Sequence, residues 1–350
     1  MIHLKSIIHG CIFIIIISLL LQKLYGPTLM LKGLQVVSAS IGNFSLIMSA
    51  KNIRWNTSEA IFIILIVACI LLGVLVQNSV KILFFGIFPL INIIALTIGL
   101  LLASNKEKYE KLHIDKTLFM LIGIFCVINF LLIIPDWFAS NRPFVFFRAT
   151  GLLFKPSSAS FTLCICVFLI MANRTIRHSL FLMTIFSFKS MSSLLFTLVS
   201  IIGTSHLAQS YNNRFYLLFF APILALTFIY IADLLYSRHL WVSVGTRFGI
   251  FSEFSLYGGG IGFGSNIAMN ATGLETRISD GTLSLLKFQF GILGIVWSFM
   301  LVFYSIRLAI NSNFVFGASI GLALFAFNIP EVAFLSLLLP YLLFESYRND

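Results

Sequence analysis

The chain has 350 residues, of which 59% are hydrophobic and only 10% are charged, and its mean hydropathy is +1.02. Soluble domains carry about 25% charged residues, so this composition excludes a soluble protein and indicates a protein that crosses the membrane several times. The net charge of +11 comes from cations scattered between apolar segments, without a basic tail. This pattern argues against nucleic acid and favours membrane lipids or a phosphate-bearing lipid substrate as partners.

Hydrophobic segments follow one another along the chain, and each approaches the roughly 20 apolar residues that cross a bilayer. The first segment is interpreted as a retained helix, because no small-residue cleavage site follows it. All five cysteines lie within apolar segments and lack metal-ligand spacing, so neither disulfides nor a metal site is expected. Hydropathy predicts helices at 7–22, 32–50 (the weakest), 59–77, 82–103, 117–134, 151–172, 215–235 and 283–306.

Two further segments are each interpreted as a pair of helices. Segment 178–204 is long enough for one tilted span, but its polar centre, SFKSMSS, also suits a turn between two short helices. Two short helices place the cations on either side, such as Arg177 and Arg214, on one face of the membrane. Short cationic loops prefer the cytoplasm, which favours the pair. Segment 313–346 is divided at Pro330, because proline cannot continue a helix cleanly.

Together these segments predict an all-α polytopic membrane protein of about 12 transmembrane helices (10–12), with both termini in the cytoplasm. The loop 236–282 then lies outside and carries nine of the chain's 23 glycines. A loop of this length without secondary structure is usually functional. The predicted parts of this single membrane domain are helices 1–5 (1–135), helices 6–9 (136–235), the long loop (236–282) and the C-terminal helices (283–350).

Cations on the predicted outer side gather in three segments. Arg142, Arg148 and Lys155 flank the start of the sixth predicted helix, Lys189 lies in the polar turn, and Arg247 lies in the long loop. The planar fork of arginine holds phosphate oxygens bidentately. Arg148 and Arg247 are therefore the main candidates for binding the phosphate of a lipid substrate, and the other three are supporting candidates.

Three segments in order resemble the O-antigen ligase and polymerase superfamily. RATGLLFKPSSAS (148–160) resembles its R-x-x-G segment, SFKSMSS is similar to its serine-rich hairpin, and SDGTLSLLKFQFGILG (279–294) looks like its closing helix. The spacing from Arg247 to Gly258 fits the R-x10-G pattern of the polymerases, which adds Gly258 to the substrate-binding candidates. Ligases carry a histidine before the closing helix, whereas this chain has Asp280 and its neighbours there, which favours a polymerase.

The resemblance implies a GT-C-like glycosyltransferase of the bacterial inner membrane. Its substrate is then undecaprenyl-diphosphate-linked oligosaccharide, joined into a polysaccharide on the periplasmic face, with a chain-length regulator and a flippase as partners. Two alternatives stay open: an O-antigen ligase that transfers glycan to lipid A-core, and a flippase or other transporter of lipid-linked oligosaccharide.

A carboxylate is expected to take the proton of the attacking sugar hydroxyl. Asp280 and Glu253 have the best positions among the acidic residues on the predicted outer side, and Arg247 completes the expected catalytic group. Glu331, beside Pro330, is interpreted as a solvated helix end. The chain contains no D-x-D pair, so a reaction without metal or cofactor is expected. The carboxylates on the predicted outer side are Asp136, Glu253, Glu275, Asp280 and Glu331.

Overall fold

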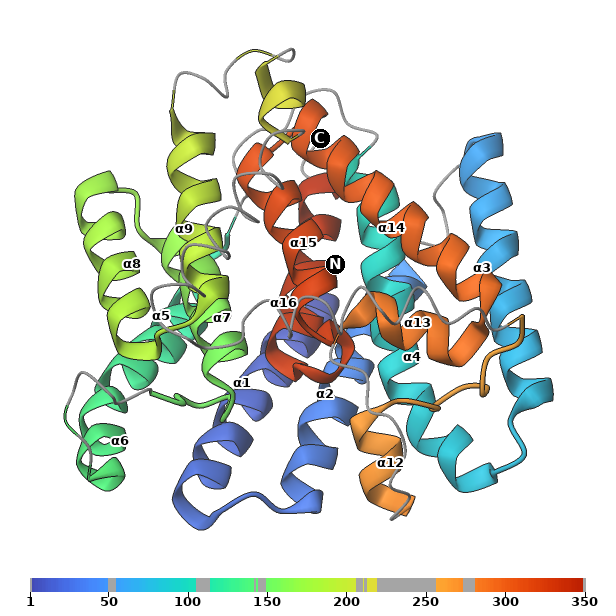
Figure 1. Cartoon of the computed structure of the whole chain (residues 1–350), viewed down its shortest axis with the longest axis horizontal. Coiled ribbons are helices and arrows are strands. Elements are labelled where there is room, and N and C mark those ends of the chain that lie inside the picture. The colour runs from blue at the N-terminus through green and yellow to red at the C-terminus, as the bar shows by residue number, and fades with distance from the viewer. Residues whose placement is uncertain are drawn as a thin grey trace.

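The structure is a computed structural model that describes residues 2–49, 55–104, 114–141, 143, 149–205, 210, 213–218, 256–272 and 281–348. Within these ranges the chain is helical and contains no strand (Figure 1), which confirms the all-α prediction. The helices, in chain order, are α1 (Ile2–Tyr25), α2 (Leu29–Ser49), α3 (Thr57–Val76), α4 (Val80–Ser104), α5 (Lys116–Leu131), α6 (Ile133–Ser140), α7 (Pro156–Ile170), α8 (Arg174–Phe188), α9 (Met191–Thr204), α12 (Asn266–Thr272), α13 (Thr282–Phe290), α14 (Ile292–Asn311), α15 (Phe314–Ala326), the 3₁₀ helix η2 (Ile329–Glu331) and α16 (Ala333–Arg348).

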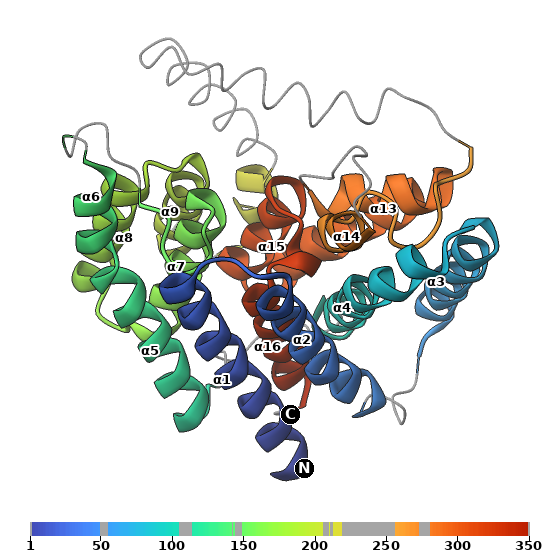
Figure 2. The same cartoon turned by 90° about the horizontal axis from the view of Figure 1, so that it is seen from below.

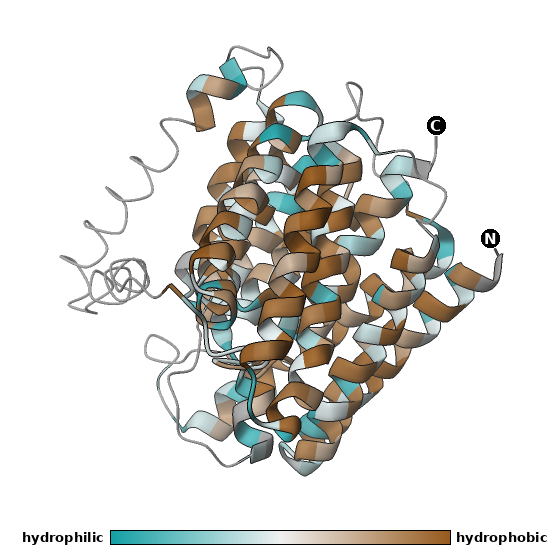
Figure 3. Ribbon diagram, turned by 90° about the vertical axis from the view of Figure 1, so that its right-hand side faces the viewer, coloured by the Kyte–Doolittle hydropathy of each residue, from teal (hydrophilic) through white to brown (hydrophobic). Residues whose placement is uncertain are grey.

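Several of these helices have the length and composition of membrane spans. Helix α3 shows the pattern clearly, because Ile64 and Leu75 are large apolar side chains that stay exposed. Hydrophobic residues also make up much of the helices (Figure 3). Exposed apolar side chains of this density suit contact with lipid. The protein is therefore membrane-embedded. Five helices among the described residues are long and apolar enough to cross a membrane: Leu4–Tyr25, Thr57–Val76, Val80–Ser104, Lys116–Ser140 and Ile292–Asn311.

Polar residues set the starts of several helices. Asn56 and Glu59 form a capping box at the start of α3, and Asp115 accepts a hydrogen bond from the backbone N–H of Leu118 at the start of α5. Pro156 occupies the first position of α7, where its missing N–H costs nothing. These local signals fix the residue at which each of these three helices begins.

The division of segment 178–204 is confirmed. Helices α8 and α9 are joined by a tight turn in which Lys189 has a φ of +46° and donates its backbone N–H to the carbonyl of Ile185. The division of the C-terminal segment is also confirmed, since η2 separates α15 from α16 at Pro330. Both turns coincide with the polar residues that interrupt the apolar sequence.

Three predicted helices differ from the structure. Segment 151–172 becomes helical only at Pro156, because Gly151 and Phe154 have positive φ angles of +59° and +57°. Segment 283–306 is broken at Gly291, which has φ +59° and ψ −130°, a conformation available essentially only to glycine. Segment 117–134 continues as α6 to Ser140 after an interruption at Leu132.

The glycine-rich loop also differs from the prediction. Residues 256–272 form a packed turn followed by α12 rather than a structureless loop. The rest of the loop lies outside the described residues, as does most of the predicted helix 215–235.

Helix α16 forms the centre of the molecule and packs against α1, α2 and α4. Both termini lie at the same edge (Figure 2), where the ammonium group of Lys5 pairs with the carboxylate of Glu345 at 2.6 Å. At this edge Asp115 also accepts a hydrogen bond from the hydroxyl of Tyr341 at 3.1 Å. These contacts connect the starts of α1 and α5 with the end of α16.

Candidate functional site

The segment Gly258–Gly264 is packed between helices through its backbone. The N–H of Gly259 donates to the carbonyl of Phe288, and the N–H of Ile261 donates to the carbonyl of Gly73 on α3. The side-chain amide of Gln77 donates to the carbonyl of Ile261 at 2.9 Å. These hydrogen bonds join the turn to α3 and α13.

Glycine is required here because the backbones approach each other closely. A Cβ atom on Gly258 would lie 2.1 Å from the carbonyl oxygen of Gln289, and one on Gly86 of α4 would lie 2.4 Å from the Cα of Gly262. Gly258, a predicted substrate-binding residue, therefore serves packing in this structure. It is not among the residues that line the cavity described below.

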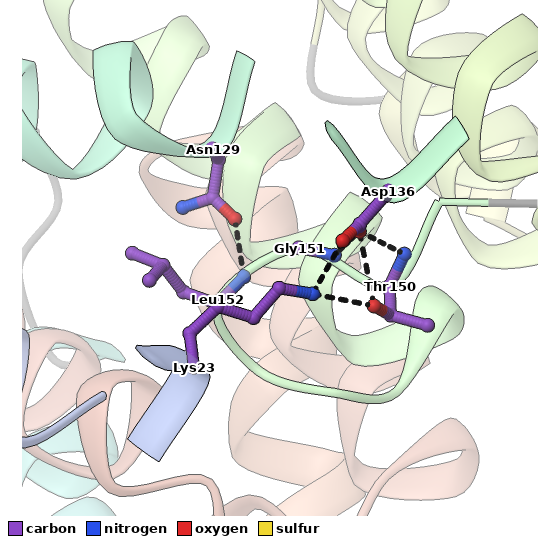
Figure 4. A network of polar contacts seen from close by, with 6 residues as sticks. All are labelled: Lys23, Asn129, Asp136, Thr150, Gly151 and Leu152. Atoms are coloured by element: carbon purple, nitrogen blue, oxygen red, sulfur yellow. Dashed lines mark hydrogen bonds and ion pairs between the residues drawn. The ribbon is translucent and has the colours of Figure 1, made fainter. Parts of the chain in front are cut away.

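The segment 149–155 is held by a polar network around Asp136 (Figure 4). One carboxylate oxygen of Asp136 accepts hydrogen bonds from the backbone N–H groups of Thr150 and Gly151 and from the hydroxyl of Thr150. The other oxygen pairs with the ammonium group of Lys23 at 2.5 Å. Asn129 on α5 accepts a hydrogen bond from the N–H of Leu152 at 3.0 Å. Asp136, one of the carboxylates on the predicted outer side, therefore positions this segment.

The serine-rich hairpin contacts the same segment. The carbonyl of Ser187 accepts a hydrogen bond from the N–H of Ala149 at 2.9 Å, and the hydroxyl of Ser192 donates to the carbonyl of Ser157 at 2.9 Å. The structure therefore brings together the two segments that carry Lys155 and Lys189. Lys155 is exposed at the start of α7, and Lys189 is partly exposed.

A cavity of about 680 Å³ opens beside this segment. Its walls come from five parts of the chain that are far apart in sequence: the α1–α2 turn with the start of α2, α4, the start of α7, α12, and the turn between α15 and α16. Figure 1 shows the α1–α2 turn and α12 at the same end of the molecule. The polar residues of the lining are Gln22, Thr28, Lys32, Gln35, Lys155, Ser157, Ser158, Asn266, Asn270, Asn328 and Glu331.

The cavity combines cations with helix N-termini. Lys32 on α2 and Lys155 before α7 line it, and both side chains are exposed. The first residues of α2, α7 and α16 also lie in or next to the lining. Unpaired N–H groups and the helix dipole make such N-termini favourable for anions. This part of the cavity can therefore bind a negatively charged group.

One carboxylate lines the cavity as well. Glu331 accepts hydrogen bonds at 2.7 Å from the hydroxyl of Ser265 and from the side-chain amide of Asn266, one on each carboxylate oxygen. Burial raises the pKa of the Glu331 carboxyl, although hydrogen bonds from these two residues favour its charged form. Glu331 lies in η2, outside both flanking apolar helices.

Polar side chains from other helices hold the turn that carries Glu331. Asn92 on α4 donates to the carbonyl of Pro330 in this turn at 2.9 Å, and Asn43 on α2 donates to the carbonyl of Ser336 in the first turn of α16 at 2.8 Å. The hydroxyl of Thr282 accepts the N–H of Ile329 at 3.0 Å. Because several helices hold this turn, the position of Glu331 is well defined.

Sequence reasoning placed the site only in part. Lys155 lines the cavity, whereas Lys189 and Gly258 do not belong to its lining. Glu331 was interpreted as a solvated helix end, but the structure shows it hydrogen-bonded at a cavity wall. Lys32 and Asn328 were not predicted. One feature of the sequence could have pointed to these residues: each is a polar residue at the edge of an apolar segment. Polar residues there are energetically costly and are usually kept for a function. The predicted residues outside the described ranges are Arg142, Arg148, Arg247, Glu253, Glu275 and Asp280.

No known protein family, curated protein or solved structure matches the chain.

Proposed function

We propose that the protein is a membrane glycosyltransferase that joins undecaprenyl-diphosphate-linked oligosaccharide repeats, as an O-antigen or surface-polysaccharide polymerase does. In this proposal it has about 12 spans in a GT-C-like arrangement in the bacterial inner membrane. Both termini are cytoplasmic, and the cavity faces the periplasm. The observation that carries the proposal is a cavity that two lysines and one carboxylate of the described residues line, with three helix N-termini in or next to the lining.

The electrostatics of the cavity suit a diphosphate leaving group. When a sugar hydroxyl attacks the anomeric carbon of a lipid-linked chain, the diphosphate departs and gains negative charge. Fixed cations and N–H groups stabilise such charge as it develops. Lys32 and Lys155 supply two cations, and we place Arg148 and Arg247 in the same role.

The size and the lining of the cavity suit a substrate that is part sugar and part lipid. A volume of about 680 Å³ lies within the range of small-molecule sites, roughly 300–1,000 Å³. Amides and hydroxyls such as Gln22, Thr28 and Asn270 can bind sugar, whereas Phe85 and Phe334 add apolar surface. A carboxylate in the same cavity supplies a base for the attacking hydroxyl.

Deletion of the gene tests the reaction class. Loss of a polymerase is expected to leave lipopolysaccharide core that carries a single repeat, seen as one band above bare core on a gel. Bare core alone is expected after loss of a ligase or a flippase, and that pattern contradicts the polymerase proposal. An unchanged ladder contradicts all three functions.

Replacing both cavity lysines tests the diphosphate site. The double variant Lys32→Met, Lys155→Met is expected to raise the KM for lipid-linked repeats about 10- to 100-fold, because two charge-assisted contacts to phosphate are lost. KM is measured with purified protein and repeats extracted from the deletion strain. Lys81→Met is the matched control, because Lys81 is also exposed near a helix start but does not line the cavity. Equal KM values for the double variant and the control contradict this site.

A further inference from the structure

Asn328 is the most unusual polar residue of the cavity wall. The residue is only 7% exposed, and neither its buried amide nitrogen nor its buried amide oxygen has a hydrogen-bond partner among the described residues. A buried amide that lacks partners destabilises a folded protein unless a ligand or water completes its hydrogen bonds. Asn328 lines the cavity, and its buried amide keeps one acceptor and a donor group for a ligand that reaches it from there.

Asn328 and Glu331 belong to the same short turn. Asn328 immediately precedes η2, and Glu331 is the last residue of η2, so both side chains leave one turn of backbone and both line the cavity. Ser265 and Asn266 each hold one oxygen of the carboxylate. The backbone N–H groups of Asn266 and Ile267, at the start of α12, also donate toward this carboxylate, which at the same time lines the cavity.

We infer that this turn is the acceptor-sugar subsite, in which Asn328 binds a sugar hydroxyl group and Glu331 removes the proton of the attacking hydroxyl. The inference rests on the proposed glycosyl transfer and assigns residues to its acceptor side. A sugar suits the pair because neighbouring hydroxyls offer both donors and acceptors, which matches an amide beside a carboxylate.

The step balances without a further reactant. The hydroxyl oxygen of the acceptor forms a bond to the anomeric carbon of the donor sugar, and the bond from that carbon to the diphosphate oxygen breaks. The bonding electron pair leaves with the diphosphate. Lys32 and Lys155, which line the cavity, stabilise the negative charge of the diphosphate. The proton passes from the hydroxyl to the carboxylate of Glu331 and then to water. Glu331 is thereby ready for the next repeat.

A structural role for Glu331 makes a different prediction. If Glu331 served only to hold α12 through Ser265 and Asn266, its replacement would lower the melting temperature and leave the kinetics of the folded fraction unchanged. A base, by contrast, affects the turnover of protein that is fully folded. General-base catalysis contributes roughly 10²- to 10⁴-fold to a rate.

The experiment uses purified full-length protein and lipid-linked repeats extracted from the deletion strain, and it measures kcat, KM and melting temperature. Glu331→Gln is expected to lower kcat about 10²- to 10⁴-fold with KM within about twofold of wild type, and Glu331→Asp to recover part of the rate. Asn328→Leu is expected to melt at or above the wild-type temperature, since an unpartnered amide is removed. Its KM is expected to rise about 10-fold or more.

Glu345→Gln is the matched control, because Glu345 is a buried carboxylate at the opposite end of α16, paired with Lys5. This control is expected to keep the wild-type kcat. Wild-type kcat in Glu331→Gln, or unchanged KM in Asn328→Leu, overturns the acceptor subsite while the proposed function stands. Failure of the wild-type protein to join the extracted repeats overturns the proposed function itself.

Discussion

Asp136→Ala is expected to lower the free energy of unfolding by about 3–5 kcal/mol, because it leaves a largely buried lysine without its carboxylate and removes a shared hydrogen-bond acceptor. Lys23 is 16% exposed and Asp136 is 12% exposed, so water replaces the lost partner poorly. The N–H groups of Thr150 and Gly151 also lose their acceptor. The measurement is thermal or denaturant unfolding of the detergent-solubilised protein.

Two further variants separate the charge from the hydrogen bonds. Lys23→Met alone is expected to cost about 1–3 kcal/mol, because Asp136 keeps its backbone and hydroxyl donors. The double variant Lys23→Met, Asp136→Ala is expected to be more stable than Asp136→Ala, since no unpaired ammonium group remains. If the double variant is as unstable as Asp136→Ala, the unpaired charge of Lys23 is not the cause of the lower stability of Asp136→Ala.

Gly258→Ala is expected to lower the free energy of unfolding by about 2–4 kcal/mol, because the new methyl group overlaps the backbone of α13. The Cβ atom would lie 2.1 Å from the oxygen and 2.2 Å from the carbonyl carbon of Gln289. Backbone atoms in a helix cannot rotate away as a side chain can. The break at Gly291 would have to open, since Gly258 also adjoins it. The measurements are the melting temperature and the yield of monodisperse protein, and both are expected to fall.

Gly123→Ala is the matched control for this substitution. Gly123 lies within α5, and a Cβ atom there would meet no atom within 4 Å. Alanine is the better helix former by about 1 kcal/mol, so this variant is expected to be as stable as wild type or more so. A Gly258→Ala protein with wild-type stability and no polymerisation would instead support binding of substrate at Gly258.

The helices were predictable because their signals are local. Long apolar segments have few stable arrangements other than membrane helices, and the polar turn at Lys189 and the proline at 330 interrupt them where the structure does. The start of α7 was predicted wrongly because hydropathy continues through 151–155. There, hydrogen bonds from Asp136 and Asn129 hold a non-helical backbone that no local signal reports.

The candidate site was predictable only in part. Lys155 stood out because a lysine near the end of an apolar helix is costly unless it reaches an anion or the interface. Glu331 gave the same signal, but proline beside it also indicates an ordinary helix end. Ser265 and Asn266, which hold the carboxylate, are 66 and 65 residues away in sequence, so local reasoning does not connect them to Glu331.

The sequence by itself determined three features. The protein is an all-helical membrane protein, the positions of most of its described helices follow from hydropathy, and 178–204 forms a hairpin. Composition and hydropathy suffice for these features because the bilayer acts on each segment separately. Only the tertiary structure decided that Gly258 packs against backbone and that Glu331, Asn328, Lys32 and Lys155 share one cavity. The role of Gly258 could not be read from the sequence, because glycine permits close approach to a ligand and to a helix equally well. The cavity could not be read either, because it exists only once distant segments have packed together.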